Sequence, residues 1–186
     1  MSRRWIFASV LAVLAGCAST VRPARVADSV QLQDGEGIIV YRMNCGPGVA
    51  WAEFYESGRS AAGYFAGFKR AGALLCPEGL QTKRVKAGTY YLGKIGYQSW
   101  IDLEEAKAMQ FTVAAGKINY IGHIRIPSTS EKRGTTTVVL ISDPEVTDRS
   151  VEARIWLAEN QPSLKQTYEF VEALAIARPS VERPGD

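Results

Sequence analysis

Three cysteines and a single histidine are the side chains best suited to nucleophilic or metal chemistry. A Ser–His–Asp site would have to use His123, which lies within a run that is typical of a strand, whereas catalytic residues more often lie on loops. A zinc site would need further nitrogen or sulfur ligands beside this histidine. We therefore predict no catalytic residue, no metal site and no cofactor, with a hydrolase as the least favoured alternative.

The first 16 residues have the composition of a secretory signal peptide. Arg3 and Arg4 precede an apolar stretch from Trp5 to Ala15. This stretch is much shorter than the roughly 20 residues that a membrane-spanning helix needs. Residues 1–16 are therefore predicted to be a signal peptide that is removed during export.

The segment Leu14-Ala15-Gly16-Cys17 resembles the lipobox of bacterial lipoproteins. The resemblance implies that the Cys17 thiol receives a diacylglyceryl group and that the new amino terminus is then acylated. Two or three acyl chains anchor a protein stably, whereas one chain binds a membrane only marginally. The residue after the cysteine is Ala18 and not aspartate, which in Gram-negative lipoproteins implies an outer-membrane anchor facing the periplasm.

If Cys17 is lipidated, Cys45 and Cys76 are the two cysteines that remain unmodified. An even number of cysteines in an oxidising compartment is typical of disulfide bonding. Such a pair predicts a disulfide, which on the chain-entropy model would stabilise the fold by roughly 3 to 4 kcal/mol. Two separate buried thiols are the alternative, and a catalytic thiol is a third option that no C-x-x-C pair supports.

Basic residues concentrate in the middle of the chain, although the formal net charge of the whole sequence is only +3. The near balance, together with the predicted compartment, argues against a nucleic-acid partner. Five of these residues form a candidate site for an anionic envelope polymer: Lys69, Arg70, Lys83, Arg84 and Lys86. Solvent-exposed strand faces, with lysines that protect sheet edges, are the simpler interpretation.

Short β-branched and aromatic runs separated by turn residues predict an antiparallel β-sandwich over residues 36–142. The predicted strands are 38–41, 49–55, 64–68, a strand after the Ala-Gly turn within 85–95, a strand after the Ala-Gly turn within 111–126, and 135–141. In the fifth run, alternation places one set of side chains on one face (Ile118, Tyr120, Ile124 and Ile126) and another set on the opposite face (Asn119, His123 and Arg125).

The ends of the chain are expected to lie outside this sandwich. Residues 17–35 are predicted to be a lipidated tether, and residues 179–186 a disordered tail. Residues 143–178 are predicted to form helices packed on the sandwich. Asp143-Pro144-Glu145 is typical of a helix start, and Ser163 to Gln166 fits a capping box for a second helix. On that second helix the apolar face would contain Leu164, Tyr168, Val171 and Ala175.

Three strand-and-turn segments carry a second resemblance: residues 37–42 (GIIVYR), 87–92 (AGTYYL) and 115–122 (AGKINYIG). They resemble segments of Gram-negative lipoproteins that have a small prealbumin-like or immunoglobulin-like β-sandwich. Some members of this broad architecture are assembly or adaptor components of envelope machines. The resemblance therefore implies a non-enzymatic lipoprotein whose β-domain binds a protein partner, with binding of an anionic polymer as the alternative.

Overall fold

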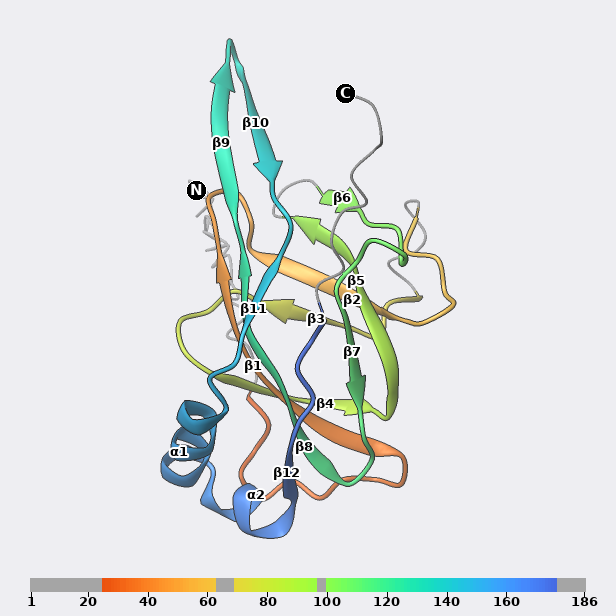
Figure 1. Ribbon diagram of the computed structural model, residues 1–186, viewed down its shortest axis with the longest axis vertical. Coiled ribbons are helices and arrows are strands. Elements are labelled where there is room, and N and C mark those ends of the chain that lie inside the picture. The colour runs from red at the N-terminus through yellow and green to blue at the C-terminus, as the bar shows by residue number, and fades with distance from the viewer. Residues whose placement is uncertain (1–24, 63–68, 97–99, 177–186) are drawn as a thin grey trace, which may run out of the picture.

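The computed structural model describes residues 25–62, 69–96 and 100–176. The predicted signal peptide, Cys17, the predicted strand at 64–68 and the predicted tail at 179–186 lie outside these ranges. The described chain forms two β-sheets, a separate β-hairpin and two short helices (Figure 1).

The first sheet is centred on two long parallel strands, β1 (Glu36–Cys45) and β8 (Lys117–Ile126). β4 (Gln81–Lys86) pairs with the other edge of β1. The free edge of β8 is shared, because β12 (Glu169–Glu172) pairs with its first half and β11 (Glu145–Thr147) with its second half.

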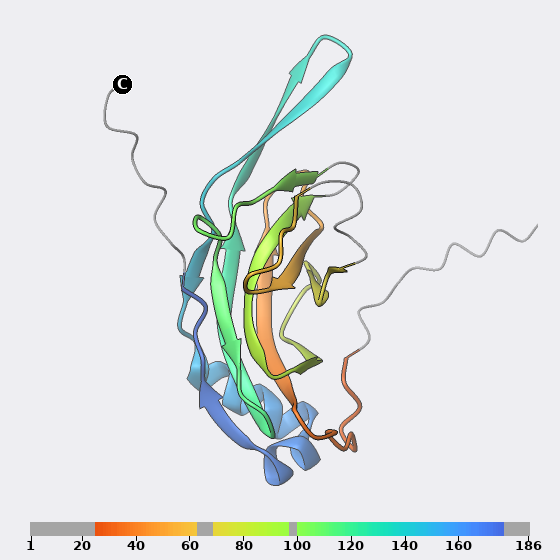
Figure 2. The same ribbon diagram turned by 90° about the vertical axis from the view of Figure 1, so that its right-hand side faces the viewer.

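The second sheet is antiparallel and is centred on β2 (Trp51–Glu56) and β5 (Gly88–Gly96). β3 (Gly72–Leu75) lies outside β2, while β7 (Gln110–Val113) and β6 (Trp100–Asp102) share the outer edge of β5. The two sheets form two layers (Figure 2), which confirms the predicted mostly-β sandwich. The parallel pairings of β8 with β1 and with β12 are the exceptions to its antiparallel character.

Alternation along β1 divides its side chains between two hydrophobic clusters. Ile39, Tyr41 and Met43 point into the space between the sheets, where they join Phe54, Leu92 and other buried residues. Ile38 and Val40 point to the outer face, where they pack against Leu157 and Leu164 of the helices. The central strands of the first sheet are therefore buried on both faces.

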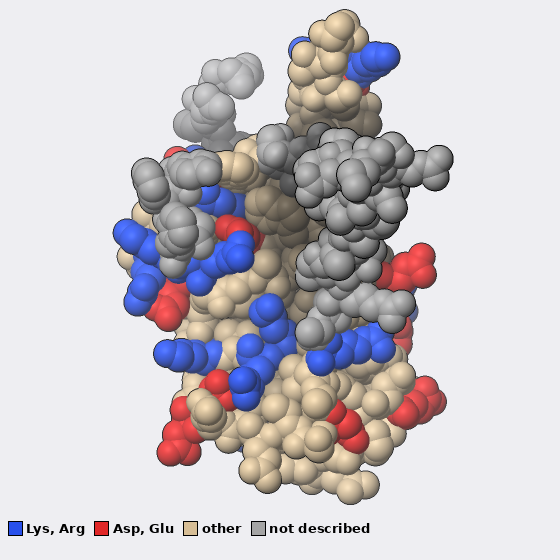
Figure 3. Space-filling model, turned by 180° about the vertical axis from the view of Figure 1, so that it is seen from behind, with Lys and Arg blue, Asp and Glu red and all other residues tan. Residues whose placement is uncertain are grey.

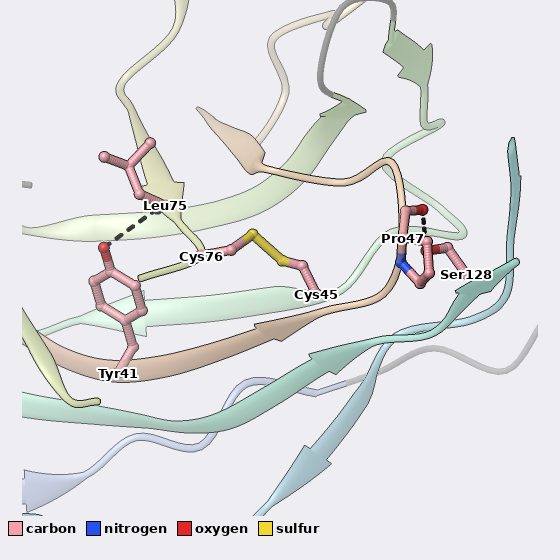
Figure 4. Close-up of a disulfide and its surroundings, with 6 residues drawn as sticks. All are labelled: Tyr41, Cys45, Pro47, Leu75, Cys76 and Ser128. Atoms are coloured by element: carbon pink, nitrogen blue, oxygen red, sulfur yellow. Dashed lines mark hydrogen bonds between the residues drawn. A yellow bond between two sulfur atoms is a disulfide. The ribbon is translucent and has the colours of Figure 1, made fainter. Parts of the chain in front are cut away.

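Two links between the sheets hold the sandwich closed. Cys45, at the end of β1, is bonded to Cys76, just after β3, with 5.9 Å between their Cα atoms (Figure 4). On the opposite side, the backbones of Gln110 and Ile176 exchange hydrogen bonds of 3.0 and 2.8 Å. The predicted disulfide is thus confirmed, and the alternative of two separate thiols is wrong.

The helices are shorter than the sequence predicts. α1 (Ser150–Asn160) begins well after Asp143, and α2 (Pro162–Thr167) ends before Tyr168. The predictions of helix at Glu145–Thr147 and at Glu169–Glu172 are wrong, since both segments are strands. Their backbone groups pair with the open edge of β8, which would otherwise lack hydrogen-bond partners.

Of the four residues expected on one face of the second helix, only Leu164 is helical. Tyr168 instead reaches back to the N-terminal segment, where its hydroxyl accepts a hydrogen bond from the Leu32 amide and donates one to the Val30 carbonyl. Val171 lies in β12, and Ala175 is buried between the sheets.

Residues 25–34, predicted as part of a tether, pack onto the helices. Val26, Val30 and Leu32 contact the cluster on the outer face of the first sheet. The Asp28 carboxylate accepts hydrogen bonds from the amides of Ser163 (2.9 Å) and Leu164 (3.1 Å). Asp28, far away in the sequence, therefore accepts hydrogen bonds from the free backbone amides at the N-terminus of α2, in place of the predicted capping box.

A β-bulge in β8 changes which side chains face the core. Opposite the bulge the register shifts between Val40 and Tyr41, and Gly122 has a φ of +108°. Consequently Ile118 and Tyr120 pack under the helices, whereas Ile121, Ile124 and Ile126 lie between the sheets. The predicted common face of Ile118, Tyr120, Ile124 and Ile126 is wrong because a strand with a bulge does not keep a period of two.

The residues predicted on the opposite face of β8 are separated in the same way. Asn119 is fully buried, and its side chain bonds the backbone of Ala114 and of Ile38. His123 lies on the outer face with Arg125, beyond the bulge. The prediction that all three share one face is therefore wrong.

We predict that Gly122→Ala lowers the free energy of unfolding by about 2 to 3 kcal/mol, since residues held in such backbone conformations cost of order 1–3 kcal/mol. An added Cβ would also lie 2.6 Å from Cγ1 of Val146 on β11. Gly116→Ala is the matched control, because its φ is +66° and nothing lies within 4 Å of the added Cβ. Urea unfolding that shows equal losses for the two variants would contradict the role of the bulge.

Candidate functional site

A hairpin projects beyond the sandwich as a separate two-stranded sheet (Figures 1 and 2). It consists of β9 (Ser128–Arg133) and β10 (Thr136–Ile141), paired in register from Ser128↔Ile141 to Arg133↔Thr136. The two-residue loop between the strands begins with Gly134, whose φ of +63° suits a tight hairpin turn. The chain thus forms a regular arm of six residue pairs.

Among the described residues, the contacts that fix the hairpin to the domain lie in the half nearest the sandwich. The Ser128 hydroxyl donates a 2.7 Å hydrogen bond to the Pro47 carbonyl (Figure 4), and Ile141 packs against the core. Val139 lies against Gly48, where a Cβ would meet its side chain at 2.6 Å. These contacts define the direction of the arm where it leaves the sandwich.

The rest of the hairpin is exposed and has no third strand in the described part of the chain. Along β9 the side chains from Thr129 to Arg133 are exposed and polar, and β10 adds Leu140, which is 55% exposed. An isolated two-stranded hairpin is at best marginally stable in water. Unpaired strand edges also offer backbone donors and acceptors to another chain. The hairpin is therefore the best candidate for a binding element.

The five predicted basic residues lie on neighbouring edge segments, and Figure 3 shows a band of Lys and Arg on this face. Lys83, Arg84 and Lys86 belong to β4, and Lys69 and Arg70 precede β3. Alternation on β4 turns Lys83 away from Arg84 and Lys86. Lys83 is half-buried close to Arg70, and its burial, followed by the charge of Arg70, lowers its pKa.

Carboxylates neutralise part of this basic group. Arg70 Nη1 lies 2.5 Å from Oε1 of Glu53, and Arg84 Nε lies 3.5 Å from Oε1 of Glu36. The hollow beside Arg84 and Lys86, about 390 Å³ in volume, is also lined by Glu36 and Glu56. The structure brings the predicted residues near one another, but it surrounds them with acids that compete with an anionic ligand.

A cluster of buried charges that was not predicted lies on the outer face of the second sheet. Glu53 of β2 lies opposite Lys94 of β5, and the two residues are 7% and 3% exposed. Tyr55 donates a 2.8 Å hydrogen bond to Glu53, and Lys94 Nζ lies 3.2 Å from Oδ1 of Asp102. Burial, reinforced by Glu53, raises the pKa of Tyr55 well above its usual range.

Glu53 is paired with Arg70 and Tyr55, and Lys94 with Asp102, which is the arrangement that buried ionic groups need for stability. The sequence signal for the cluster is a Glu between apolar residues in WAEFYE (Glu53) and a lone Lys within GKIG (Lys94), both in predicted strands. Their pairing depends on the register of β2 against β5, which the sequence alone does not specify.

His123 lies half-buried on the outer face of β8, with its ring edge-on to Tyr120 at a centroid distance of 6.2 Å. Its Nε2 has no hydrogen-bond partner among the described residues. Burial lowers the pKa of His123, and the nearby charges of Arg42 and Arg149 add to this effect against the opposing charge of Glu152.

Within the described residues, no group of three or more His, Cys, Asp and Glu side chains is placed to hold a metal ion. The same part of the chain contains no helix long and apolar enough to cross a membrane. Comparison of the sequence and structure with protein-family models, curated proteins and solved structures gives no match.

The depressed pKa of His123 predicts a loss of stability as the pH falls. The unfolded chain binds a proton near pH 6.5, whereas folded His123 binds it only at lower pH, so protonation favours unfolding below about pH 6.5. Urea unfolding from pH 8 to pH 5 should show a steeper decline for the wild type than for His123→Gln, which keeps a polar side chain but does not titrate. Parallel curves would contradict this prediction.

Proposed function

We propose that the protein is a non-enzymatic outer-membrane lipoprotein, anchored through Cys17 and facing the periplasm, that binds a protein partner through the β9–β10 hairpin. The observation that carries this proposal is the projecting arm with unpaired strand edges. A protein partner could add a strand to either edge and thereby satisfy its backbone groups.

The chemistry of the arm supports a protein over a small ligand. Its exposed face combines an aliphatic side chain, Leu140, with threonines and with the charged residues Glu131, Lys132 and Arg133. Glu131 and Arg133 form an exposed ion pair at 2.9 Å, which contributes little to stability and remains available for exchange with a partner. Mixed apolar and polar surfaces of this kind are typical of non-obligate protein interfaces.

The anchor rests on Leu14-Ala15-Gly16-Cys17 and on the apolar segment before it. Residues from Arg25 onward already belong to the packed domain, so lipidation at Cys17 would leave only a short connection to the membrane. The disulfide suits an oxidising compartment such as the periplasm.

Cys17→Ala should leave an uncleaved and unlipidated precursor, because the sulfur atom of the Cys17 thiol accepts the lipid. The measurement is labelling of cells with radioactive palmitate, together with the intact mass of the purified protein. Cys17→Ser is a matched control that keeps the size of the side chain and also lacks the thiol. Normal processing and labelling of either variant would show that the anchor is assigned wrongly.

Site-specific photo-crosslinking in living cells tests the partner. A photoreactive residue at Lys132 or Thr137, both exposed on the hairpin, should yield one protein adduct. The same residue at Thr112, exposed on β7 in the other sheet, should not. Leu140→Asp should reduce the adduct several-fold without changing the urea unfolding midpoint.

Adducts at Thr112 but none at the hairpin would contradict the proposed binding element. If a tagged protein purified from crosslinked cells carries a glycan or lipid and no protein, the alternative of an anionic polymer gains support instead. That alternative predicts salt-sensitive binding that is lost on charge reversal of Lys83, Arg84 and Lys86.

A further inference from the structure

The exposed face of α1 carries aliphatic side chains next to a hollow. Val151 and Ile155 lie one helical turn apart and are 70% and 55% exposed. The adjoining hollow, about 660 Å³ in volume, is lined by these two residues and by Leu80 and Trp156. Side chains of both charges also line it, including Arg42, Arg149 and Glu152.

The described chain begins beside this face. The Arg25 guanidinium lies 5.3 Å from the centre of the Trp156 ring, and Trp156 is one wall of the hollow. The Val26 carbonyl accepts a hydrogen bond from the Gln161 side chain, and Asp28 caps α2. The start of the domain is therefore fixed against the two helices.

This attachment limits how far α1 can be from a lipid on Cys17. Residues 17 to 25 span at most roughly 28 Å, since an extended chain covers at most about 3.3–3.6 Å per residue. Taking the proposed anchor as given, Arg25 lies within that distance of the bilayer surface, and the Trp156 ring lies 5.3 Å from its guanidinium.

From this placement we propose that the exposed face of α1, formed by Val151, Ile155 and Trp156, contacts the phospholipid surface. The proposal rests on the anchor at Cys17. Aliphatic residues enter the outer part of the bilayer, a tryptophan ring suits the headgroup region, and arginines such as Arg149 bind lipid phosphates. The contact is weak alone, but the short tether raises its effective concentration.

This orientation directs the hairpin away from the membrane. The helices and the hairpin lie at opposite ends of the molecule (Figure 1). β8 and β9 follow one another from Lys117 to Arg133, a path of about 50 Å at the rise of a β-strand. A domain resting on α1 therefore presents the hairpin to a partner in the periplasm.

The test uses the full-length lipidated protein in vesicles of phosphatidylethanolamine and phosphatidylglycerol. A photoreactive residue replaces Ile155 in one variant and Leu140, which is equally exposed at the other end of the molecule, in the matched control. After illumination, vesicles are floated and the floated protein is analysed for lipid adducts by mass spectrometry. We expect both variants to float and the adduct at position 155 to exceed that at position 140 several-fold.

The outcomes separate the two proposals. Flotation with equal or no lipid adducts at the two positions would overturn the contact of α1 while leaving the anchor in place. Failure of both variants to float would overturn the anchor and, with it, this inference. A protein adduct at position 155 in living cells, without a lipid adduct, would show that α1 docks a protein.

Discussion

The fold depends on the position of β8 and on the bulge at Gly122. The strand carries apolar residues at 118, 120, 121, 124 and 126, a pattern that fits no uninterrupted alternation. Without the bulge, the alternation set by Ile121 would point His123 and Arg125 into the space between the sheets, where an unpaired charge is very costly. The bulge keeps isoleucines in the core on both sides of Gly122. It also leaves His123 on the outer face, where its burial is partial and its charge state responds to pH.

The shared edge of β8 also determines where the helices lie. β11 and β12 each pair with about half of this edge, so the chain between them must leave the sheet and return. That excursion contains α1 and α2, and it covers the apolar outer side chains of β1 and β8. Local helix signals at Asp143 and Ser163 did not predict these boundaries, because the competing interaction is backbone pairing with a strand that lies 20 or more positions away. The Asp28 cap is missed for the same reason, since it comes from the other end of the chain.

Sequence patterns identify the strands β1, β2, β5, β8 and β10, the sandwich and the disulfide, because alternation, turn residues and cysteine number are local or compositional properties. The register between two strands depends on how distant parts of the chain pair, and no local pattern specifies it. Glu53 and Lys94 lie opposite each other only because β2 and β5 pair in one particular alignment. The predicted basic group is likewise altered by pairing, which brings Glu36 and Glu53 beside Arg84 and Arg70. The hairpin run at 135–141 was visible in the sequence as a strand, but its projection beyond the sandwich depends on tertiary structure.

A rigid connection between the two ends of the molecule links the proposed anchor to the proposed binding element. β8 passes through the centre of the first sheet and continues through Pro127 directly into β9. The base of the hairpin is held by Ser128 and Val139, and the start of the domain is held by Arg25 and Asp28 on the helices. Within the described residues, both the start of the domain and the base of the hairpin are therefore fixed to the sandwich and its helices. With α1 on the bilayer, a partner bound to the hairpin would be held at a nearly constant height above the membrane. In the proposed function, this fixed orientation of the domain would determine where the hairpin presents its unpaired strand edges to a partner.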